Sequence, residues 1–303
     1  MTESQIEQYA LDILSNLGWQ ILHGPDIGPD GAAVERDLRQ VVLPERLYNA
    51  LVRLNPHIPE PALNEAMRRL TQISKPSLVE NNHDFHQLLV VGVPVQYRVS
   101  SGETKHDIVR VVDFTSPHNN DFAAVNQLTV LQGDYNRRPD IVLFVNGLPL
   151  VVIELKNAAD TKADLVAAYQ QIQTYKREIS DLFRFNELCV TSDGLEAEMG
   201  TITSPLERMM PWKTIDGEKE VGNVPMLEVL LRGVCTPEHL LDVVQNFIVF
   251  ERGDDDKLIK KVAVYHQYWV VNKALDRTLA ASSEHGDQRA GVVWHTQGSG
   301  KSL

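Results

Sequence analysis

The sequence predicts a layered domain of the α/β or α+β class, in which helices cover a central mixed sheet. Apolar residues recur with a helical period in some segments and form short continuous runs in others. The runs at 141–144 and 150–155 are almost entirely apolar, which is typical of strands buried on both faces of a sheet. The chain has 303 residues, 43% of them hydrophobic, so it is long enough to bury a large core.

Helices are expected where apolar residues are spaced three and four apart behind an N-terminal signal. The first follows a capping box of Ser4 and Glu7 and ends before Gly18. Pro44 fits a first helical position, and Thr236 caps a later helix. The expected helical segments are residues 4–17, 36–54, 60–73, 161–179, 236–250 and 257–280.

Strands are expected in other apolar stretches. Residues 85–99 are predicted to be extended, with a break at Gly92 and Pro94. The other expected strands are residues 108–114, 127–131, 141–144, 150–155, 187–191 and 291–294. The polar, acidic stretch at 251–256 is expected to be a loop or boundary. We place one domain at 1–235, followed at 236–303 by connector helices and the start of a second domain.

The composition excludes several classes of protein. The net charge is −12, which argues against a chain whose main task is to coat nucleic acid, although a local basic groove or DNA affinity borrowed from partners remains open. The two cysteines exclude a disulfide scaffold and a zinc ribbon, and the ten histidines show no metal-binding spacing. Neither a signal peptide nor a membrane span is expected, so the cytoplasm is the expected location.

Two carboxylates and a lysine flank the hairpin signal Asn146-Gly147. Glu154 and Lys156 share one face of their strand. A plain two-residue turn would place Asp140 opposite residue 153, on the wrong face. We therefore expect a three-residue loop, 145–147, which places Asp140 opposite residue 152 and diagonal to Glu154.

This constellation has the chemistry of a nuclease. Asp140 and Glu154 can hold Mg²⁺ while leaving positions for water and phosphate. Lys156 can orient the attacking water or neutralise developing charge. The alternative is an exposed hairpin with ordinary surface charges, but here the charges interrupt apolar central strands, where an unpaired charge is costly.

Three more residues are candidates for the same site. Gln171 and Tyr175 lie four apart on one face of the next helix, from which they can reach the site or a DNA backbone. Tyr175 can equally be a core residue. Glu7 can add a third acidic group, although its role in the capping box is favoured.

The C-terminal residues look like a Walker A loop, which binds the phosphates of ATP and a Mg²⁺ ion. His295 stands where the common pattern has its first glycine. Upstream, Gln267 is placed to read an adenine edge. We expect that this chain cannot hydrolyse ATP by itself and is the front part of a longer polypeptide. The candidate phosphate-binding residues are Gly298, Ser299, Gly300, Lys301 and Ser302.

These residues resemble a known family, the N-terminal part of the restriction (R) subunit of type I restriction–modification enzymes. The resemblance covers nearly the whole chain and is most specific between Val112 and Asn157. The motifs that carry the resemblance are residues 112–114, residues 119–122, Asn126-Gln127, Arg138-Pro139-Asp140, residues 146–149, residues 153–157, Tyr265-His266-Gln267 and residues 295–302.

The resemblance implies a restriction-endonuclease-like core of the PD-(D/E)xK type up to about residue 235, followed by the start of a RecA-like motor. It implies that Asp140, Glu154 and Lys156 are metal and catalytic residues, and Gln171 and Tyr175 match a Gln-x-x-x-Tyr pattern of the family. It further implies double-stranded DNA as substrate, ATP-driven translocation, and modification (M) and specificity (S) subunits as partners, with no membrane.

Two other functions remain open. The chain can belong to a repair or methyl-directed nuclease joined to a helicase, which would not depend on a separate methyltransferase. It can also be a non-catalytic nuclease-like domain that serves as a docking platform for the motor. The intact Asp140, Glu154 and Lys156 argue against the second of these.

Overall fold

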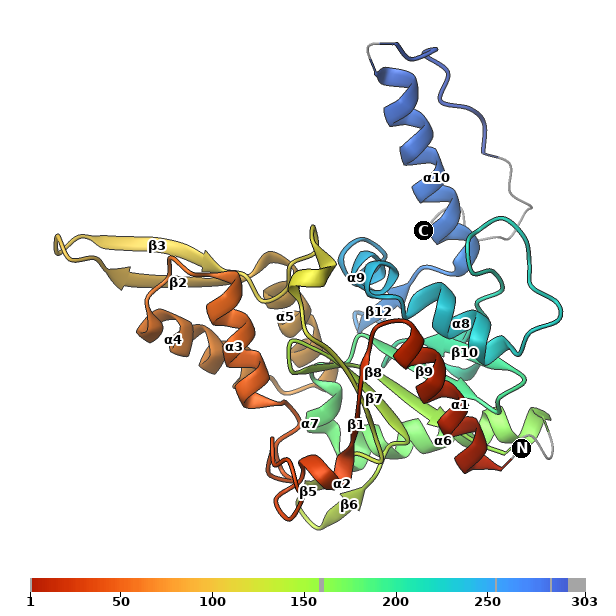
Figure 1. The fold of residues 1–303 in the computed structure, drawn as a ribbon, viewed down its shortest axis with the longest axis horizontal. Helices are drawn as coiled ribbons and strands as arrows, with labels where there is room; N and C mark the ends of the chain where they lie inside the picture. Colours follow the sequence, from red (N-terminus) through yellow and green to blue (C-terminus); the bar gives the residue numbers. More distant parts are fainter. Residues whose placement is uncertain (1, 158–160, 254, 284, 294–303) are drawn as a thin grey trace.

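A computed structural model of the chain describes residues 2–157, 161–253, 255–283 and 285–293. At its centre is a six-stranded mixed sheet (Figure 1). Neighbouring strands are antiparallel except for β1 with β4 and β8 with β9, which are parallel. The strand order is β1 (Gln20–His23), β4 (Phe122–Asn126), β7 (Ile141–Val145), β8 (Leu148–Leu155), β9 (Leu188–Ser192) and β10 (Ala197–Gly200). The predicted α/β class with a central mixed sheet is confirmed.

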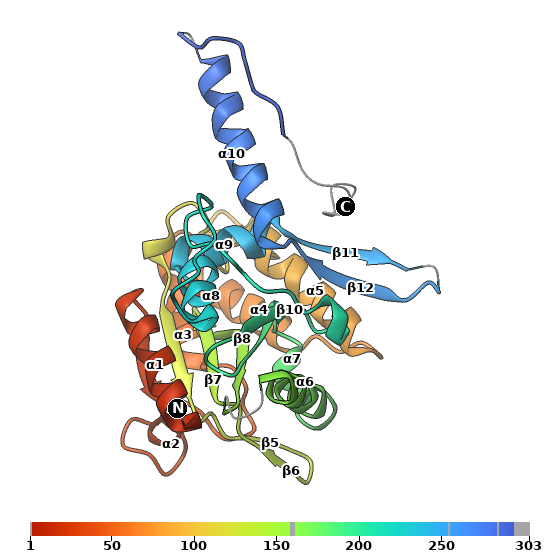
Figure 2. The same cartoon turned by 90° about the vertical axis from the view of Figure 1, so that its right-hand side faces the viewer.

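The middle of the sheet is formed by β7 and β8, in which every residue is buried. Their sequences are almost continuously apolar because both faces of the sheet are covered, as predicted. Figure 2 shows α1 (Glu3–Asn16) and α6 (Thr161–Glu178) on opposite sides of these strands. The two predicted strands at 141–144 and 150–155 and the helix at 161–179 are therefore confirmed to within one or two residues.

The other elements surround this sheet. Three two-stranded sheets lie outside it: β2 (Val93–Arg98) with β3 (Thr104–Val109), β5 (Val130–Gln132) with β6 (Tyr135–Arg137), and β11 (Ile248–Arg252) with β12 (Leu258–Val262). The remaining helices are α2 (Gly24–Ile27), α3 (Pro44–Leu54), α4 (Glu60–Thr71), α5 (Leu78–Val91), α7 (Ser180–Phe183), α8 (Met226–Val234), α9 (Pro237–Asn246) and α10 (Tyr265–Ser282), with short 3₁₀ helices η1 (Pro117–Asn119) and η2 (Leu206–Arg208). Of the helices in the described ranges, none is long and apolar enough to cross a bilayer.

The prediction of an extended segment at 85–99 is wrong for its first half. Residues 85–91 belong to α5, which begins behind Ser77, whose side chain accepts a hydrogen bond from the Glu80 N–H. Gly92, with φ of 93°, ends the helix, and only β2 is extended. The predicted strands at 108–114 and 127–131 overlap β3 and β5 at only two residues each.

Several predicted helix boundaries also need correction. Pro44 begins α3 as expected, but residues 36–43 before it are not helical. Thr236 caps α9 as expected, but the helix ends at Asn246 and is followed by β11. Residues 258–262 form β12, and α10 begins only at Tyr265. Residues 291–293 form no strand, and residue 294 lies outside the described residues.

Candidate active site

The turn between β7 and β8 differs from the predicted one. Val145 pairs with Leu148, so Asn146 and Gly147 form a two-residue turn, with φ of 50° and 77°. The expected three-residue loop is therefore wrong. The register shifts within the strands instead, because Leu150 is an extra residue in β8 without a partner in β7. This β-bulge shifts the pairing of the two strands by one residue, as the predicted three-residue loop would have done.

The bulge brings the two carboxylates onto one face of the sheet. Ile141 pairs with Ile153, so Asp140 and Glu154, each one residue further along, lie directly across from one another. The predicted pairing of Asp140 with residue 152 is wrong, but the predicted shared face is correct. Directly opposite residues of an antiparallel pair have neighbouring side chains.

Lys156 completes the cluster. Its Nζ donates to Glu154 Oε1 at 2.7 Å and to the Leu155 carbonyl at 3.0 Å. The Leu155 N–H donates to Asp140 Oδ2 at 2.8 Å. Glu154 is only 2% exposed, and its Oε2 has no hydrogen-bond partner among the described residues. A buried carboxylate oxygen without a partner is costly, and binding a cation there would relieve that cost.

Burial sets the protonation of this site. It raises the pKa of Glu154 to about 7, and the charge of Asp140 acts in the same direction. The pKa of Asp140 is also raised, mainly by burial, although the Leu155 N–H opposes this. Burial lowers the pKa of Lys156, but the charge and hydrogen bond of Glu154, together with the charges of Asp140 and Glu3, outweigh burial, so the pKa lies above its ordinary value. Two carboxylates that resist ionisation beside one ammonium are typical of functional sites.

Glu7 reaches the same region from α1. The expected capping box of Ser4 and Glu7 is wrong, because Thr2 and Gln5 form the box two residues earlier. Glu7 is therefore free of a capping role, and its carboxylate accepts hydrogen bonds of 2.6 Å from Asn126 and from Gln127. Its charge contributes to the raised pKa of Asp140.

Asn126 and Gln127, which hold the Glu7 carboxylate, could not be recognised in that role from the sequence. Their only signal is an amide pair at the end of β4, of which Asn126 is the last residue. The side chains of both point at Glu7, which lies far from them in the sequence. Proximity between such distant residues follows from the sheet order and not from local spacing.

Gln171 and Tyr175 lie on α6, as predicted. Tyr175 is buried, and its hydroxyl donates to the Arg138 carbonyl at 3.4 Å. Burial raises the pKa of Tyr175, and the charges of Glu154 and Asp140 add to this, while a hydrogen bond with Gln171 opposes it. The structure therefore brings Tyr175 next to the carboxylates, with Gln171 beside it.

The candidate residues of the second domain are only partly described. Residues 298–302 lie outside the described residues. Gln267 lies on α10 as predicted, and its Oε1 accepts a hydrogen bond of 3.0 Å from the Val264 N–H at the helix start. It lines a pocket of about 490 Å³ together with Trp212 and Met199.

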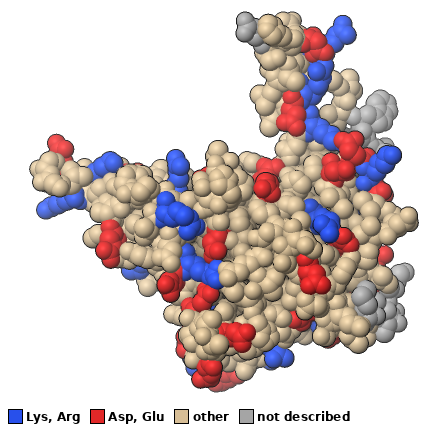
Figure 3. Space-filling view, in the orientation of Figure 1, with Lys and Arg blue, Asp and Glu red and all other residues tan. Residues whose placement is uncertain are grey.

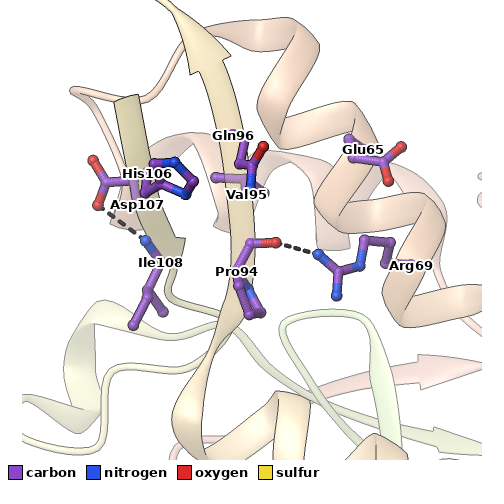
Figure 4. Close-up of a pocket in the computed structure, with 8 residues that line it drawn as sticks. All are labelled: Glu65, Arg69, Pro94, Val95, Gln96, His106, Asp107 and Ile108. Atoms are coloured by element: carbon purple, nitrogen blue, oxygen red, sulfur yellow. Dashed lines mark hydrogen bonds between the residues drawn. The ribbon is translucent and has the colours of Figure 1, made fainter. Parts of the chain in front are cut away.

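Other cavities and clusters do not coincide with the predicted site. A cleft of about 630 Å³ lies between α4 and the β2–β3 hairpin, where Arg69 donates to the Pro94 carbonyl (Figure 4). It contains none of the predicted site residues. Within the described part of the chain, no group of three or more His, Cys, Asp or Glu side chains can hold a metal ion. Asp140 and Glu154 are a pair of carboxylates that could hold a metal ion together with water or substrate oxygens.

An α/β domain in which two acidic side chains and a lysine meet at the end of a buried strand pair is consistent with a nuclease-like domain. The chain belongs to the family described as the type I restriction enzyme R protein N terminus, which matches residues 1–208. The expected resemblance is thereby confirmed. Residues 266–303 match a second family, the SWI2/SNF2 ATPases.

Relatives of the chain are named as endonuclease subunits of type I restriction enzymes. The chain is 44% identical, over 308 aligned positions and its whole length, to the type I restriction enzyme HindI endonuclease subunit of Haemophilus influenzae. It is 29% identical, over 98% of its length, to the putative type I restriction enzyme MjaIXP endonuclease subunit of Methanocaldococcus jannaschii. The chain spans 29% and 30% of the lengths of these two relatives.

Proposed function

We propose that this chain is the DNA-cleaving part of a type I restriction endonuclease subunit, with a restriction-endonuclease-like core of the PD-(D/E)xK type. The observation that carries the proposal is the convergence of Asp140, Glu154 and Lys156 at one end of the buried β7–β8 pair. Membership of the family supports the endonuclease role. It also disfavours a repair nuclease of another family.

The carboxylates fit a magnesium ion. Glu154 Oε2 is buried without a partner, and Asp140 uses Oδ2 for the Leu155 N–H, which leaves its other oxygen for a ligand. Mg²⁺ commonly binds to one or two carboxylates and completes its shell with water and phosphate oxygens. When bound, Mg²⁺ would acidify a water molecule and stabilise negative charge on the phosphodiester.

Side chains of the protein would have the other roles in the reaction. The ammonium of Lys156 is held between Glu154 and the Leu155 carbonyl, from which it can donate to a phosphate oxygen as charge develops there. Tyr175 lies buried next to the carboxylates, with Gln171 beside it. Glu7 supplies a third negative charge from α1, held by two amide groups.

The second domain would drive translocation in the longer protein. The SWI2/SNF2 match supports an ATPase-like part. We propose that Gly298, Ser299, Gly300, Lys301 and Ser302 bind the phosphates of ATP and that Gln267 contacts the adenine. Cleavage of double-stranded DNA in the cytoplasm would follow translocation, with M and S subunits holding the complex on its substrate.

The proposal is tested with the full-length subunit assembled with its modification and specificity partners on a plasmid that carries a recognition site. ATP hydrolysis and strand cleavage are recorded together for wild type and Lys156→Ala. We expect cleavage to fall by at least about 100-fold while ATP hydrolysis persists, because only the charge beside the phosphodiester is removed. Lys105→Ala, which removes a half-exposed lysine of β3, is the matched control.

Two outcomes would contradict the proposal. Normal cleavage by Lys156→Ala would show that the site is structural, which favours the docking-platform function. Cleavage by the subunit without the modification partner would favour a nuclease–helicase of another kind.

A further inference from the structure

A lysine that the proposed chemistry does not use is buried in the β11–β12 hairpin. Lys260 is 1% exposed although it lies in a strand of only five residues. Its neighbours Ile259 and Lys261 are only partly buried. The hairpin leads directly into α10, and the ATPase match begins at residue 266. A buried charge at this place needs a partner, because desolvation of an ammonium is expensive.

All three donors of the Lys260 ammonium have partners on the sheet side. Nζ donates to Glu187 Oε2 at 2.6 Å, to Asn82 Oδ1 at 2.9 Å and to the Asn186 carbonyl at 2.9 Å. Glu187 is itself fully buried and also contacts His86 Nδ1 at 3.1 Å. The hairpin is thereby bonded through one side chain to α5 and to the residues just before β9.

The main chain of Lys260 is held as well. Thr201 and Thr203 each donate a hydroxyl hydrogen bond of 2.7 Å to the Lys260 carbonyl. The Lys260 N–H donates to Thr203 Oγ1 at 2.9 Å. Residues 201–203 follow β10, which pairs with β9. Both the backbone and the side chain of Lys260 therefore fix the hairpin to the edge of the central sheet.

The partners of Lys260 also hold the bulge that aligns the carboxylates. The Glu187 N–H donates to the Leu150 carbonyl at 2.6 Å, and Asn186 Nδ2 donates to the same carbonyl at 3.4 Å. Leu150 is the extra residue that places Asp140 across from Glu154. Further along, β9 pairs in parallel with the part of β8 that carries Glu154.

We propose that Lys260 is a positioning residue for the nuclease site, which links the segment that enters the ATPase-like region to the bulge that sets the Asp140–Glu154 alignment. This inference rests on the proposed nuclease function. A displacement of the hairpin would shift Asn186 and Glu187, which bond to Leu150. A shift of Leu150 would in turn change how Asp140 and Glu154 are aligned. Lys260 touches neither substrate nor metal in this scheme.

The test uses the full-length subunit in its assembled complex. Lys260→Met removes the charge, and the double variant Lys260→Met/Glu187→Gln removes both charges while keeping the shapes of the side chains. We expect both variants to remain folded at the assay temperature and to hydrolyse ATP. We expect cleavage to fall about 10- to 100-fold, and the concentration of magnesium chloride for half-maximal cleavage to rise, because small misplacements of catalytic groups have effects of this size.

Lys261→Met is the matched control, since Lys261 is the next residue of β12 and forms a partly exposed ion pair with Glu251. It should cleave like wild type. Wild-type cleavage and magnesium dependence in the folded double variant would overturn the inference. Loss of the folded state in both Lys260 variants would also overturn it, because the residue would then stabilise the fold as a whole. Lys156→Ala, measured alongside, separates these results from failure of the nuclease assignment, which normal cleavage by that variant would indicate.

Discussion

Glu154 is an acidic side chain at the end of an otherwise apolar strand, and its pKa of about 7 follows mainly from that position. The folded chain binds this proton more tightly than the unfolded chain does. Between the ordinary value of 4.5 and about 7, deprotonation therefore costs folding free energy. The contribution of Glu154 to the free energy of unfolding therefore falls as the pH rises through this range. Above about pH 7 this contribution no longer changes with pH.

Replacement of this carboxyl by an amide should remove that dependence. In the metal-free chain, the free energy of unfolding of Glu154→Gln should rise relative to that of wild type as the pH rises from about 5 to about 8. The relative increase should reach about 3 kcal/mol at the upper end of this range. Urea unfolding in the presence of a chelator measures this difference. Glu65→Gln, at a partly exposed carboxylate of α4, should follow the wild-type curve. A constant difference between Glu154→Gln and wild type across this range would contradict the raised pKa.

At the scale of single residues, the sequence predicted which carboxylates and lysine lie together better than it predicted the residues that support them. Asp140, Glu154 and Lys156 were recognisable because charge is rare within central apolar strands. Lys260 was not recognisable, since a lysine in a polar stretch is normally solvated and its buried partner Glu187 is distant in the sequence. Glu7 was assigned mainly to a capping box because Ser4 and Glu7 fit the local pattern, but Thr2 and Gln5 fit it as well, and the helix begins behind Thr2.

At the scale of elements, the loop length of the β7–β8 hairpin was predicted wrongly, but the shared face of Asp140 and Glu154 was predicted correctly. The Asn146-Gly147 turn was predicted as a hairpin signal, and its positive φ values match the two-residue turn that this dipeptide favours. The bulge at Leu150 carries no local signal, because that residue is a leucine within an apolar run. Its carbonyl accepts hydrogen bonds from Asn186 and Glu187, which lie far from it in the sequence.

Gly147 should tolerate no side chain. Its φ is +77°, and a Cβ there would lie 2.5 Å from the Leu43 carbonyl oxygen and 2.8 Å from the Leu47 nitrogen. Gly147→Ala should therefore lower the free energy of unfolding by at least about 2 kcal/mol. Gly133→Ala is the control, because Gly133 also has positive φ but has nothing within 4 Å, so only backbone strain of about 1 kcal/mol applies. Equal losses in urea unfolding would show that the contact with α3 is unimportant.

Two of the wrongly predicted segments, α5 and β12, share one cause, which is polar residues on buried faces. The inner face of α5 buries Asn81, Asn82 and His86 beside Phe85 and Leu89. These polar side chains break the apolar period, so only the apolar run before Gly92 was visible and was taken as extended. The same holds for β12, where burial of Lys260 hides the strand pattern. The all-apolar strands β7 and β8 and the long helix α6 were predicted well because their patterns are complete.

At the scale of the whole molecule, charge determines what the chain can do without partners. Its net charge is −12, and on the face shown in Figure 3 acidic and basic side chains are interspersed. A protein that holds DNA by itself gains affinity by neutralising phosphates with clustered lysine and arginine. We therefore expect the proposed cleavage of DNA to depend on other parts of the protein, or on other subunits, that keep the substrate near this site.

This requirement gives a direct expectation for the 303-residue chain on its own. Its dissociation constant for a short DNA duplex at physiological salt should be no tighter than about 10⁻⁵ M, within the range of non-specific binding. Fluorescence anisotropy over a series of salt concentrations measures both the affinity and the number of phosphate contacts, and the assembled complex on the same duplex is the positive control. A dissociation constant below about 10⁻⁷ M with a steep salt dependence would show that the chain carries its own phosphate-binding surface. In that case the partner subunits would be needed to select the site and not to hold the DNA.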